Sequence, residues 1–475
     1  MNSTSILEDS AHSAQSRAFG CAELLSDIFM HRVLDDYDIP SPRKAPLTLG
    51  HVSRHWRTIA FGSSLLWSQA YFHIDPDVGI APSLLQGYVS AITFWLIQSG
   101  QSLLDFNLVV KYPHEQDFRT IDLQADYERH ILDLMVIFID HRDRWRNIAL
   151  TLPPFVSKIF CGPTLSFPNL EAFYLCHSYG RRWNHDNSNE LPMVFPLVLP
   201  GSFLPTLRQL CLADTTLRCE GSSQVIQLRK LSLRNVRIPY NHFAMLPALF
   251  PLLEKLSVTI RAPHHIANGP FITFDNLRSL TSVSEKGVPL NIITAPALEY
   301  LSITWSPDKF SHDIDGTQIF NGNLLAFLRR SSPPLKAFSY SSGYLRDSMD
   351  PILQEIQGIS ELKINHAHLP SDALQMLFRA SFFSDLRKLS IYNSLSYYNM
   401  HEAITADGML EFLLERGSGD CKTCPVKLES LDVCMHEGEY QKMCSLRQLS
   451  LHKMLPRMTI RNMHVCDESL CRRHN

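Results

Sequence analysis

LRKLSL from Leu228 and LEKLSV from Leu253 are two copies of the six-residue pattern that decides the fold of this chain. In both, apolar residues occupy the first, fourth and sixth positions, and polar residues occupy the others. Further clear copies begin at Leu207, Leu298, Leu386 and Leu446, and weaker copies begin at Leu103, Trp145, Leu170, Leu277, Leu335, Ile359 and Leu428. From residue 207 to residue 298 the copies start 21, 25, 24 and 21 residues apart, so the pattern is periodic.

The spacing within each copy has a physical meaning. Alternate side chains of a strand point to opposite faces, so the fourth and sixth positions point into a core while the third and fifth point away from it. One strand cannot bury its apolar side alone, but parallel stacking of successive copies buries a continuous stripe. A period of about 20 to 29 residues is typical of leucine-rich repeats. We therefore predict an α/β fold in which residues 103–475 form an irregular leucine-rich-repeat solenoid with parallel strands on its inner face.

The connections between copies show why the array is irregular. The Asn or Cys that follows each strand of a regular array is replaced by Thr215, Val236 and Ala367. Steps of 37, 37 and 42 residues, starting at residues 170, 298 and 386, contain polar, turn-rich sequence that we expect to form loops outside the stack. Apolar residues three and four apart predict helices in the returning segments 323–330 and 372–379.

Upstream of the repeats, residues 19–73 have the pattern of three short helices. The first has apolar residues at helical spacing around Leu24 and Ile28, and the second begins near Pro46. Gly62-Ser63 ends the second helix and precedes a short third one that holds Trp67. Fewer than about 60 residues bury too little apolar surface to be comfortably stable alone, so a partner is expected.

The order of ELLSDIF, PLTLGHVSRHWRTIA and SSLLWS in this region resembles the F-box of fungal F-box proteins. In that family the helices dock on the Skp-type adaptor of SCF ubiquitin ligases, and irregular repeat arrays often follow them. The resemblance implies that eight residues either face the adaptor or hold the helices together, namely Leu24, Leu25, Ile28, Leu49, Val52, Trp56, Ile59 and Trp67. The chain departs from the family where Phe19-Gly20-Cys21-Ala22 replaces the usual Leu-Pro entry and where residues 35–44 form a longer polar connection.

Four regions follow from these patterns. Residues 1–18 are rich in serine and other small polar residues and are expected to be disordered. Residues 19–73 form the F-box-like helical domain, residues 74–102 a connector with a linking helix over 84–99, and residues 103–475 the solenoid. Gly100 is expected to end the linking helix.

The composition limits the classes of partner and location. The chain of 475 residues has a formal net charge of −3, so no broad basic field attracts nucleic acid or an anionic membrane. Its apolar runs are shorter than the roughly 18 residues that a membrane helix needs, and residues 1–20 lack a secretory signal pattern. The 11 irregularly spaced cysteines are expected to be reduced thiols. We expect a cytoplasmic protein, a nuclear one, or both.

No catalytic motif is present in the sequence. The G-x-S-x-G, P-loop, H-E-x-x-H and G-x-G-x-x-G patterns are all missing, so we expect neither an enzyme nor a cofactor. Cys421 and Cys424, with Cys434, His436 and Cys444 after them, could supply zinc ligands, but their spacing fits no common zinc module. We expect no metal and interpret them as free thiols in an insertion, with zinc as the open alternative.

The third and fifth positions of the copies line the predicted inner face. Serine recurs at the fifth position, beside larger polar side chains at the third, and this suits a protein or peptide ligand better than a buried small molecule. The candidate target-binding residues are Lys230, Lys255, Tyr300 and Lys388. The alternative is that serine is simply tolerated in a strand that faces solvent.

Two functions remain open at this point. In the first, the chain is the substrate-recognition subunit of an SCF-type E3 ubiquitin ligase: the F-box binds the Skp-type adaptor, the repeats bind a target protein, and catalysis is proximity supplied to another enzyme. In the second, it is a leucine-rich-repeat interaction scaffold with a degenerate F-box that only caps the array. The missing Leu-Pro pair favours the second.

Overall fold

The computed structural model describes residues 24–29, 31, 46–75, 82–112, 121–161, 165–178, 196–198, 204–218, 226–236, 238, 240–259, 270–284, 289–305, 314–342, 350–365, 383–392, 428–435 and 458–462. The chain divides into two compact units, residues 1–228 (unit 1) and 229–475 (unit 2). In the described part of the chain, no helix is both long enough and apolar enough to cross a membrane.

Unit 1 begins with short helices. Residues 24–29 are helical, and they are followed by α2 (Leu49–Val52), α3 (Arg54–Gly62) and the 3₁₀-helix η1 (Ser64–Trp67). The sequence predicted one continuous helix from near Pro46 to Gly62-Ser63, which is wrong at Ser53. That residue is extended, and its hydroxyl accepts a hydrogen bond of 3.1 Å from the main-chain N–H of Trp56. Serine offers its own side chain to the N–H groups of a new first turn, so it starts α3 instead of continuing α2.

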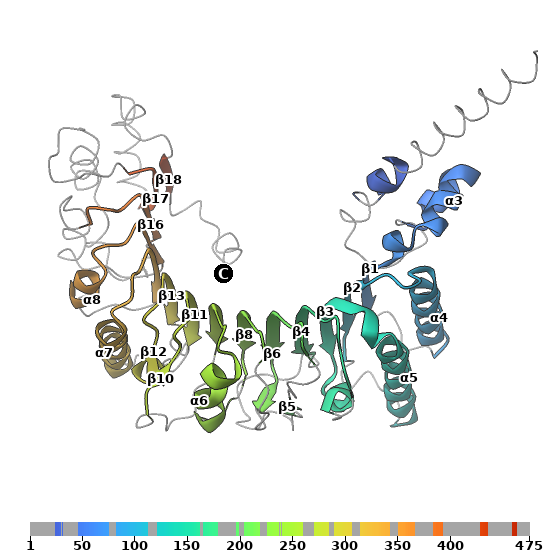
Figure 1. Ribbon diagram of the computed structural model, residues 1–475, viewed down its shortest axis with the longest axis horizontal. Helices are drawn as coiled ribbons and strands as arrows, with labels where there is room; N and C mark the ends of the chain where they lie inside the picture. The colour runs from blue at the N-terminus through green and yellow to red at the C-terminus, as the bar shows by residue number, and fades with distance from the viewer. Residues whose placement is uncertain are drawn as a thin grey trace, which may run out of the picture. The chain divides into compact units, whose positions relative to one another are not determined.

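From β1 to β4, unit 1 alternates strands and helices, as Figure 1 shows, and further strands follow. Its elements are β1 (Gln69–Ile74), α4 (Pro82–Gln98), β2 (Leu104–Val110), α5 (Ile121–Asp140), η3 (Arg142–Arg144), β3 (Trp145–Leu152), η4 (Pro154–Cys161), β4 (Ala172–His177), β5 (Pro196–Val198), β6 (Gln209–Ala213) and β7 (Thr216–Arg218). Strands β1, β2, β3, β4 and β6 pair in that order and are all parallel, while β5 pairs with β7 in a separate short sheet.

The sheet of unit 1 starts earlier than the repeat pattern indicated. We predicted the first strand near residue 103, whereas β1 lies at Gln69–Ile74 and pairs with β2. Its apolar side chains Phe72 and Ile74 are buried at alternate positions, so it completes the sheet although it lacks the leucine pattern. The linking helix is confirmed as α4, and Gly100 follows it with a left-handed φ of 54°, a conformation that glycine adopts at little cost.

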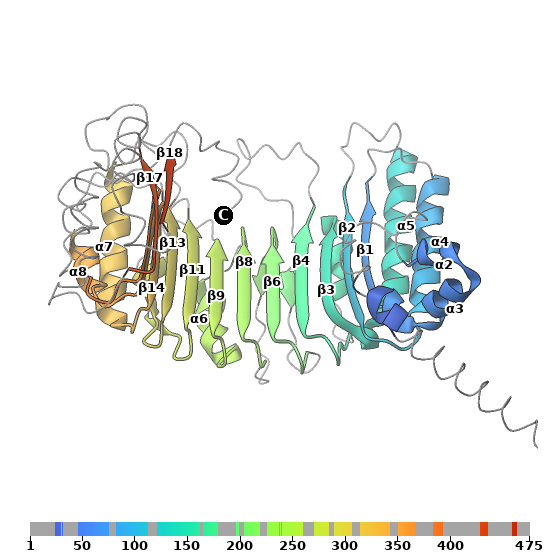
Figure 2. The ribbon, with the colours of Figure 1, turned by 90° about the horizontal axis from the view of Figure 1, so that it is seen from above.

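Unit 2 contains the most regular repeats. Its elements are β8 (Lys230–Arg234), α6 (Tyr240–Leu249), β9 (Lys255–Thr259), β10 (Ile272–Thr273), β11 (Ser279–Ser284), η6 (Pro289–Asn291), β12 (Ile293–Thr294), β13 (Tyr300–Trp305), α7 (Ile314–Ser331), β14 (Ala337–Ser342), α8 (Asp350–Glu355), β15 (Glu361–Asn365), β16 (Lys388–Tyr392), β17 (Ser430–Met435) and β18 (Met458–Asn462). Figure 2 shows its long strands side by side and pointing the same way. All of them pair in parallel and in chain order apart from β10 and β12, which form their own short pair.

The register of unit 2 confirms the repeat pattern. Fourth-position side chains of neighbouring strands align and are all buried, namely Leu231, Leu256, Leu280, Leu301, Phe338, Leu362, Leu389 and Leu431. Burying one such side chain is worth roughly 1.5 to 3 kcal/mol, so this row alone is a large part of the core. The parallel, in-order sheet is the architecture expected of a leucine-rich-repeat solenoid.

Helices cover the core side of each sheet. In unit 1, Phe138 of α5 stacks on Phe106 of β2 with ring centroids 4.6 Å apart. In unit 2, Phe320 of α7 stacks on Trp305 of β13 with ring centroids 5.9 Å apart. The helix predicted over 323–330 is confirmed, because these residues lie within α7.

The C-terminal copy beginning at Leu446 lies outside the described residues, as do the predicted helix over 372–379, the loops expected at 180–190 and 415–424, Ala367 and residues 1–18. The loop expected at 306–316 is wrong at its end, because α7 begins at Ile314. The strand that pairs with β17 is β18, at Met458–Asn462, a segment in which we predicted no strand.

Candidate functional site

The first candidate site is the outward face of the unit 2 sheet, which points away from the core and is lined by the third and fifth positions that were predicted above to form the inner face of the solenoid. The register aligns the third positions in one row, Lys230, Lys255, Ser279, Tyr300, Ala337, Glu361, Lys388 and Ser430. The fifth positions form a second row, Ser232, Ser257, Thr281, Ser302, Ser339, Lys363, Ser390 and Asp432. Five successive strands therefore place a small hydroxyl at the same height.

All four predicted target-binding residues are exposed, but they do not form one cluster. Lys230 and Lys255 are register neighbours on β8 and β9. Tyr300 lies on β13, two strands beyond β9, and its side chain is 48% exposed. Lys388 lies on β16, three strands further on.

A shallow hollow of about 180 Å³ lies over β11, β13, β14 and β15. Tyr300, Glu361 and Lys363 flank it, and small side chains line it, including Thr281, Ser302, Ala337 and Ser339. Drug-sized ligands usually occupy cavities of about 300 Å³ or more. The hollow is therefore suited to one protruding side chain of a larger ligand.

A row of ion pairs follows the second positions, a feature that our sequence reasoning missed. Arg229 pairs with Glu254 at 3.0 Å, and Glu299 lies 3.7 Å from Arg278 and 2.6 Å from Lys336. The hydrogen bond from Lys336 is the main reason that the pKa of Glu299 is lowered. The signal was present as an alternation of basic and acidic residues immediately after the first leucine of each copy. Each exposed pair of this kind contributes little to stability. Together, the pairs place opposite charges on neighbouring repeats.

The N-terminal helices are the second candidate site, and the structure sorts the eight residues named above. Leu24, Ile28 and Val52 have exposed fractions of 61%, 51% and 61%. Leu49 and Trp67 are buried, whereas Leu25, Trp56 and Ile59 are half-buried. Only the exposed and half-buried residues are in a position to meet a partner.

Trp67 holds the helices to the rest of unit 1. Its ring centroid lies 5.2 Å from that of Phe61, 5.6 Å from Phe94 and 4.9 Å from Trp95. Its indole N–H donates a hydrogen bond of 2.8 Å to the main-chain oxygen of Ala60. Because Phe94 and Trp95 belong to α4, the buried ring joins the N-terminal helices to α4, whose Trp95 also contacts Phe72 of β1 at 6.1 Å.

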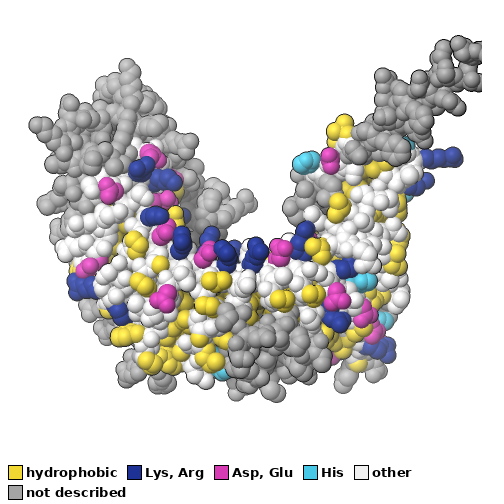
Figure 3. Space-filling model, in the orientation of Figure 1, with side chains coloured by type: hydrophobic (Ala, Val, Ile, Leu, Met, Phe, Trp, Pro, Cys, Tyr) yellow, Lys and Arg dark blue, Asp and Glu magenta, His cyan; other side chains and the backbone are white. Residues whose placement is uncertain are grey.

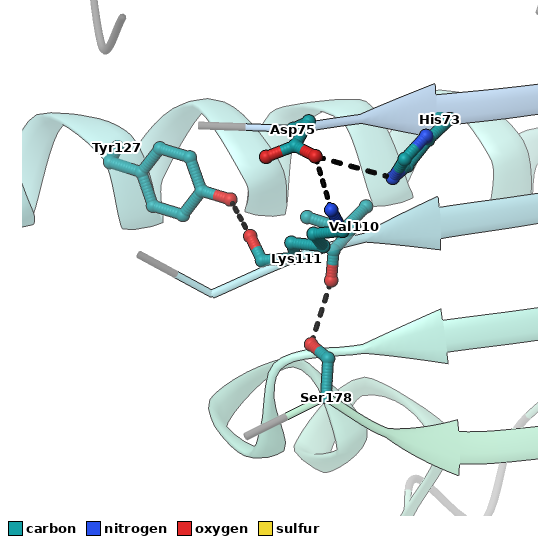
Figure 4. A network of polar contacts seen from close by, with 6 residues as sticks. All are labelled: His73, Asp75, Val110, Lys111, Tyr127 and Ser178. Carbon is teal, nitrogen blue, oxygen red and sulfur yellow. Dashed lines mark hydrogen bonds and ion pairs between the residues drawn. The ribbon is translucent and has the colours of Figure 1, made fainter. Parts of the chain in front are cut away.

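A polar network closes the carboxyl ends of β1, β2 and β4 (Figure 4). Asp75 forms an ion pair with Lys111 and lies 3.8 Å from Nε2 of His73. Tyr127 of α5 donates a hydrogen bond of 2.7 Å to the main-chain oxygen of Lys111, and Ser178 donates one of 2.7 Å to that of Val110. Burial raises the pKa of Tyr127, so its hydroxyl remains a donor. Both hydroxyl groups donate to main-chain oxygens, which do not titrate, and we therefore interpret the network as structural.

The strand β4 ends in Cys176 and His177, two residue types that can carry chemistry. Burial raises the pKa of the Cys176 thiol to about 11, which is opposite to the change that activates a nucleophilic thiol. Burial also lowers the pKa of His177, whose Nδ1 lies 3.0 Å from the main-chain oxygen of Asp214. Over the described ranges, no group of three or more His, Cys, Asp or Glu side chains could hold a metal ion. Cys421 and Cys424 lie outside those ranges.

Comparisons with known proteins assign no family to this chain. No protein-family model matches the chain, and no curated protein matches it. One similar solved structure is an internalin from Listeria monocytogenes, which is 12% identical, covers 58% of this chain and 84% of its own, and has a TM-score of 0.27. The leucine-rich-repeat assignment therefore rests on the parallel register of this chain's own sheet.

Proposed function

We propose that this chain is the substrate-recognition subunit of an SCF-type E3 ubiquitin ligase and acts in the cytoplasm, the nucleus or both. Its N-terminal helices would bind the Skp-type adaptor, and the outward face of its repeats would bind a target protein. The observation that carries the first part is the exposure of Leu24, Ile28 and Val52 on helices whose sequence resembles the F-box.

The free energy of burial explains why these three residues matter. Each large apolar side chain gains roughly 1.5 to 3 kcal/mol when it moves from water into an interface. The first helix and α3 contact each other through the rings of Phe29 and Trp56, whose centroids lie 4.8 Å apart, so exposed apolar side chains of the N-terminal helices are available for docking.

The strand face supports the second part. Its row of half-buried hydroxyls and the shallow hollow beside the exposed Tyr300 suit contact with a polypeptide better than enclosure of a small molecule. Nothing in this arrangement performs a bond-breaking step, so the contribution to catalysis would be the proximity of target and ligase.

Retention of the adaptor tests the proposal. The full chain carrying Leu24→Ala, Ile28→Ala and Val52→Ala should lose a co-expressed Skp-type adaptor during purification. The matched control is Ile97→Ala, which removes an equally exposed apolar side chain from α4 and should leave retention unchanged. A folded wild-type chain that never retains the adaptor would refute the assignment.

The second candidate function is a repeat scaffold whose N-terminal helices only cap the sheet. The packing of Trp67 against Phe94 and Trp95 favours it, because this contact fixes the helices to unit 1 without any partner. It predicts that residues 46–75 resist proteolysis equally with and without added adaptor.

A further inference from the structure

Charge is distributed unevenly along the strand face of unit 2. The repeats of β8, β9 and β11 contain five cations and one anion between their second and seventh positions, namely Arg229, Lys230, Arg234, Lys255 and Arg278 with Glu254. The repeats of β13 to β17 contain four of each over the same positions, namely Lys336, Lys363, Arg387 and Lys388 with Glu299, Glu361, Glu429 and Asp432. Figure 3 shows Lys and Arg side chains along this side of the molecule. The excess of positive charge belongs to the first three strands.

Lys230 and Lys255 occupy the same position of neighbouring parallel strands, and both are exposed. Neighbouring strands are about 4.8 Å apart, and like charges placed side by side across a sheet are destabilising. Lys388 has the same position in its repeat but lies 3.4 Å from a carboxylate oxygen of Glu361. In the part of the chain that the structure describes, no carboxylate pairs with Lys230, Lys255 or Arg234.

From this arrangement we infer that Lys230, Lys255 and Arg234 form a binding site for an extended, Asp/Glu-rich segment of a partner protein. The inference rests on the proposed function, in which the repeats hold the target, and it states the chemistry of that target. Carboxylates of the partner would supply counter-charges that none of the described residues provides, and they would relieve the repulsion between the two lysines.

The small side chains around the cations allow a polypeptide to come close. Ser257 and Thr281 lie at the fifth positions of β9 and β11. Their small side chains do not project far from the sheet, and they offer hydroxyl donors to a ligand. Successive side chains on one side of an extended peptide are about 6.7 Å apart. The long side chains of Lys230 and Lys255 can reach carboxylates at that spacing.

A nucleic acid fits this surface less well than an acidic peptide. Single strands bind through aromatic platforms inside a broad positive groove. Here the exposed ring of Tyr300 lies two strands beyond Lys255, and the three cations of the site lie on only two neighbouring strands, which are about 4.8 Å apart. The formal net charge of the chain is −3, so no wider positive field supports them.

Fluorescence anisotropy with defined probes tests the inference on the full chain. The probe is a fluorescein-labelled peptide of alternating Glu and Ser, and a peptide with Gln in place of Glu is the charge control. Wild type should bind the Glu peptide, more weakly at higher salt, and should not bind the Gln peptide. The double variant Lys230→Ala, Lys255→Ala should bind about tenfold more weakly, because two ion pairs are lost. Lys388→Ala removes a lysine from the same position of another repeat and should stay within about twofold of wild type.

Several results would overturn the inference. These are equal binding of the Gln peptide, an equal loss in Lys388→Ala, absence of binding to the Glu peptide, or tighter binding of a uridine oligonucleotide at the same lysines. Adaptor retention separates this test from that of the proposed function, since the double variant should retain the adaptor as wild type does. If neither wild type nor the lysine variants retained the adaptor while wild type still bound the Glu peptide, only the ligase role would be refuted.

Discussion

Replacing Trp67 with alanine should destabilise unit 1 more than most other single changes among the N-terminal helices. The side chain has an exposed fraction of 0%, and its ring contacts three other aromatic rings. Its N–H also satisfies the main-chain oxygen of Ala60, a buried acceptor that alanine would leave without this donor.

The size of the effect follows from these contacts. Truncating a buried aromatic side chain to alanine costs about 3 to 5 kcal/mol, and the lost hydrogen bond adds about 1 kcal/mol. For a unit of this size, each kcal/mol lowers the unfolding midpoint by roughly 2 to 4 °C, so a shift on the order of 10 °C is expected.

Thermal unfolding followed by circular dichroism at one scan rate measures this shift. The control is Leu65→Ala, because Leu65 lies in the same 3₁₀-helix but is exposed, and its removal should cost no more than about 0.5 kcal/mol. If Trp67→Ala shifted the midpoint no more than Leu65→Ala does, Trp67 would not be what holds these helices to the sheet.

Three further changes test other parts of the structure. Gly50→Ala should destabilise the N-terminal helices by about 1 kcal/mol or more in denaturant unfolding, because an added Cβ would lie 2.8 Å from Cε2 of the Phe61 ring; unchanged stability would mean that the ring moves aside freely. Leu301→Ala should cost about 2 to 5 kcal/mol in the same measurement, since the side chain is buried in the row between β11 and β14, and a cost below about 1 kcal/mol would contradict the assigned register. Because burial lowers the pKa of His177, the folded state binds its proton less readily than the unfolded chain, so its contribution to stability is complete above the ordinary histidine pKa of 6.5 and is lost as the pH falls below it. Stability measured from neutral to mildly acidic pH should therefore fall less steeply in His177→Gln than in wild type, and identical slopes would exclude His177 as the cause.

The repeat architecture could be predicted well because it depends on local spacing. Leu231 and Leu233 share one side of a strand whatever surrounds them, and the same spacing in the next copy aligns Leu256 with Leu231. The alternation of Arg229 and Glu254 was equally visible in the sequence, but it lies at the second position of each copy, whereas the predicted binding face used only the third and fifth positions.

The elements that lack the pattern could not be predicted in this way. The strands β1 and β18 contain no leucine, and each is a strand because it pairs with the strand beside it, β2 or β17. The break at Ser53 was hidden because helical periodicity continues through it, while a single side-chain hydrogen bond decides where α3 starts.

The sequence by itself determined that leucines repeat with the spacing of parallel strands and that short amphipathic helices precede them. Only the tertiary structure decided that Trp67 is enclosed while Val52 is exposed, since exposure depends on whether a distant segment such as α4 covers the residue. It also decided that Lys230 and Lys255 are neighbours while Lys388 has a carboxylate partner. Spacing along a chain fixes the side of an element to which a residue belongs, whereas its neighbours come from residues far away in the chain.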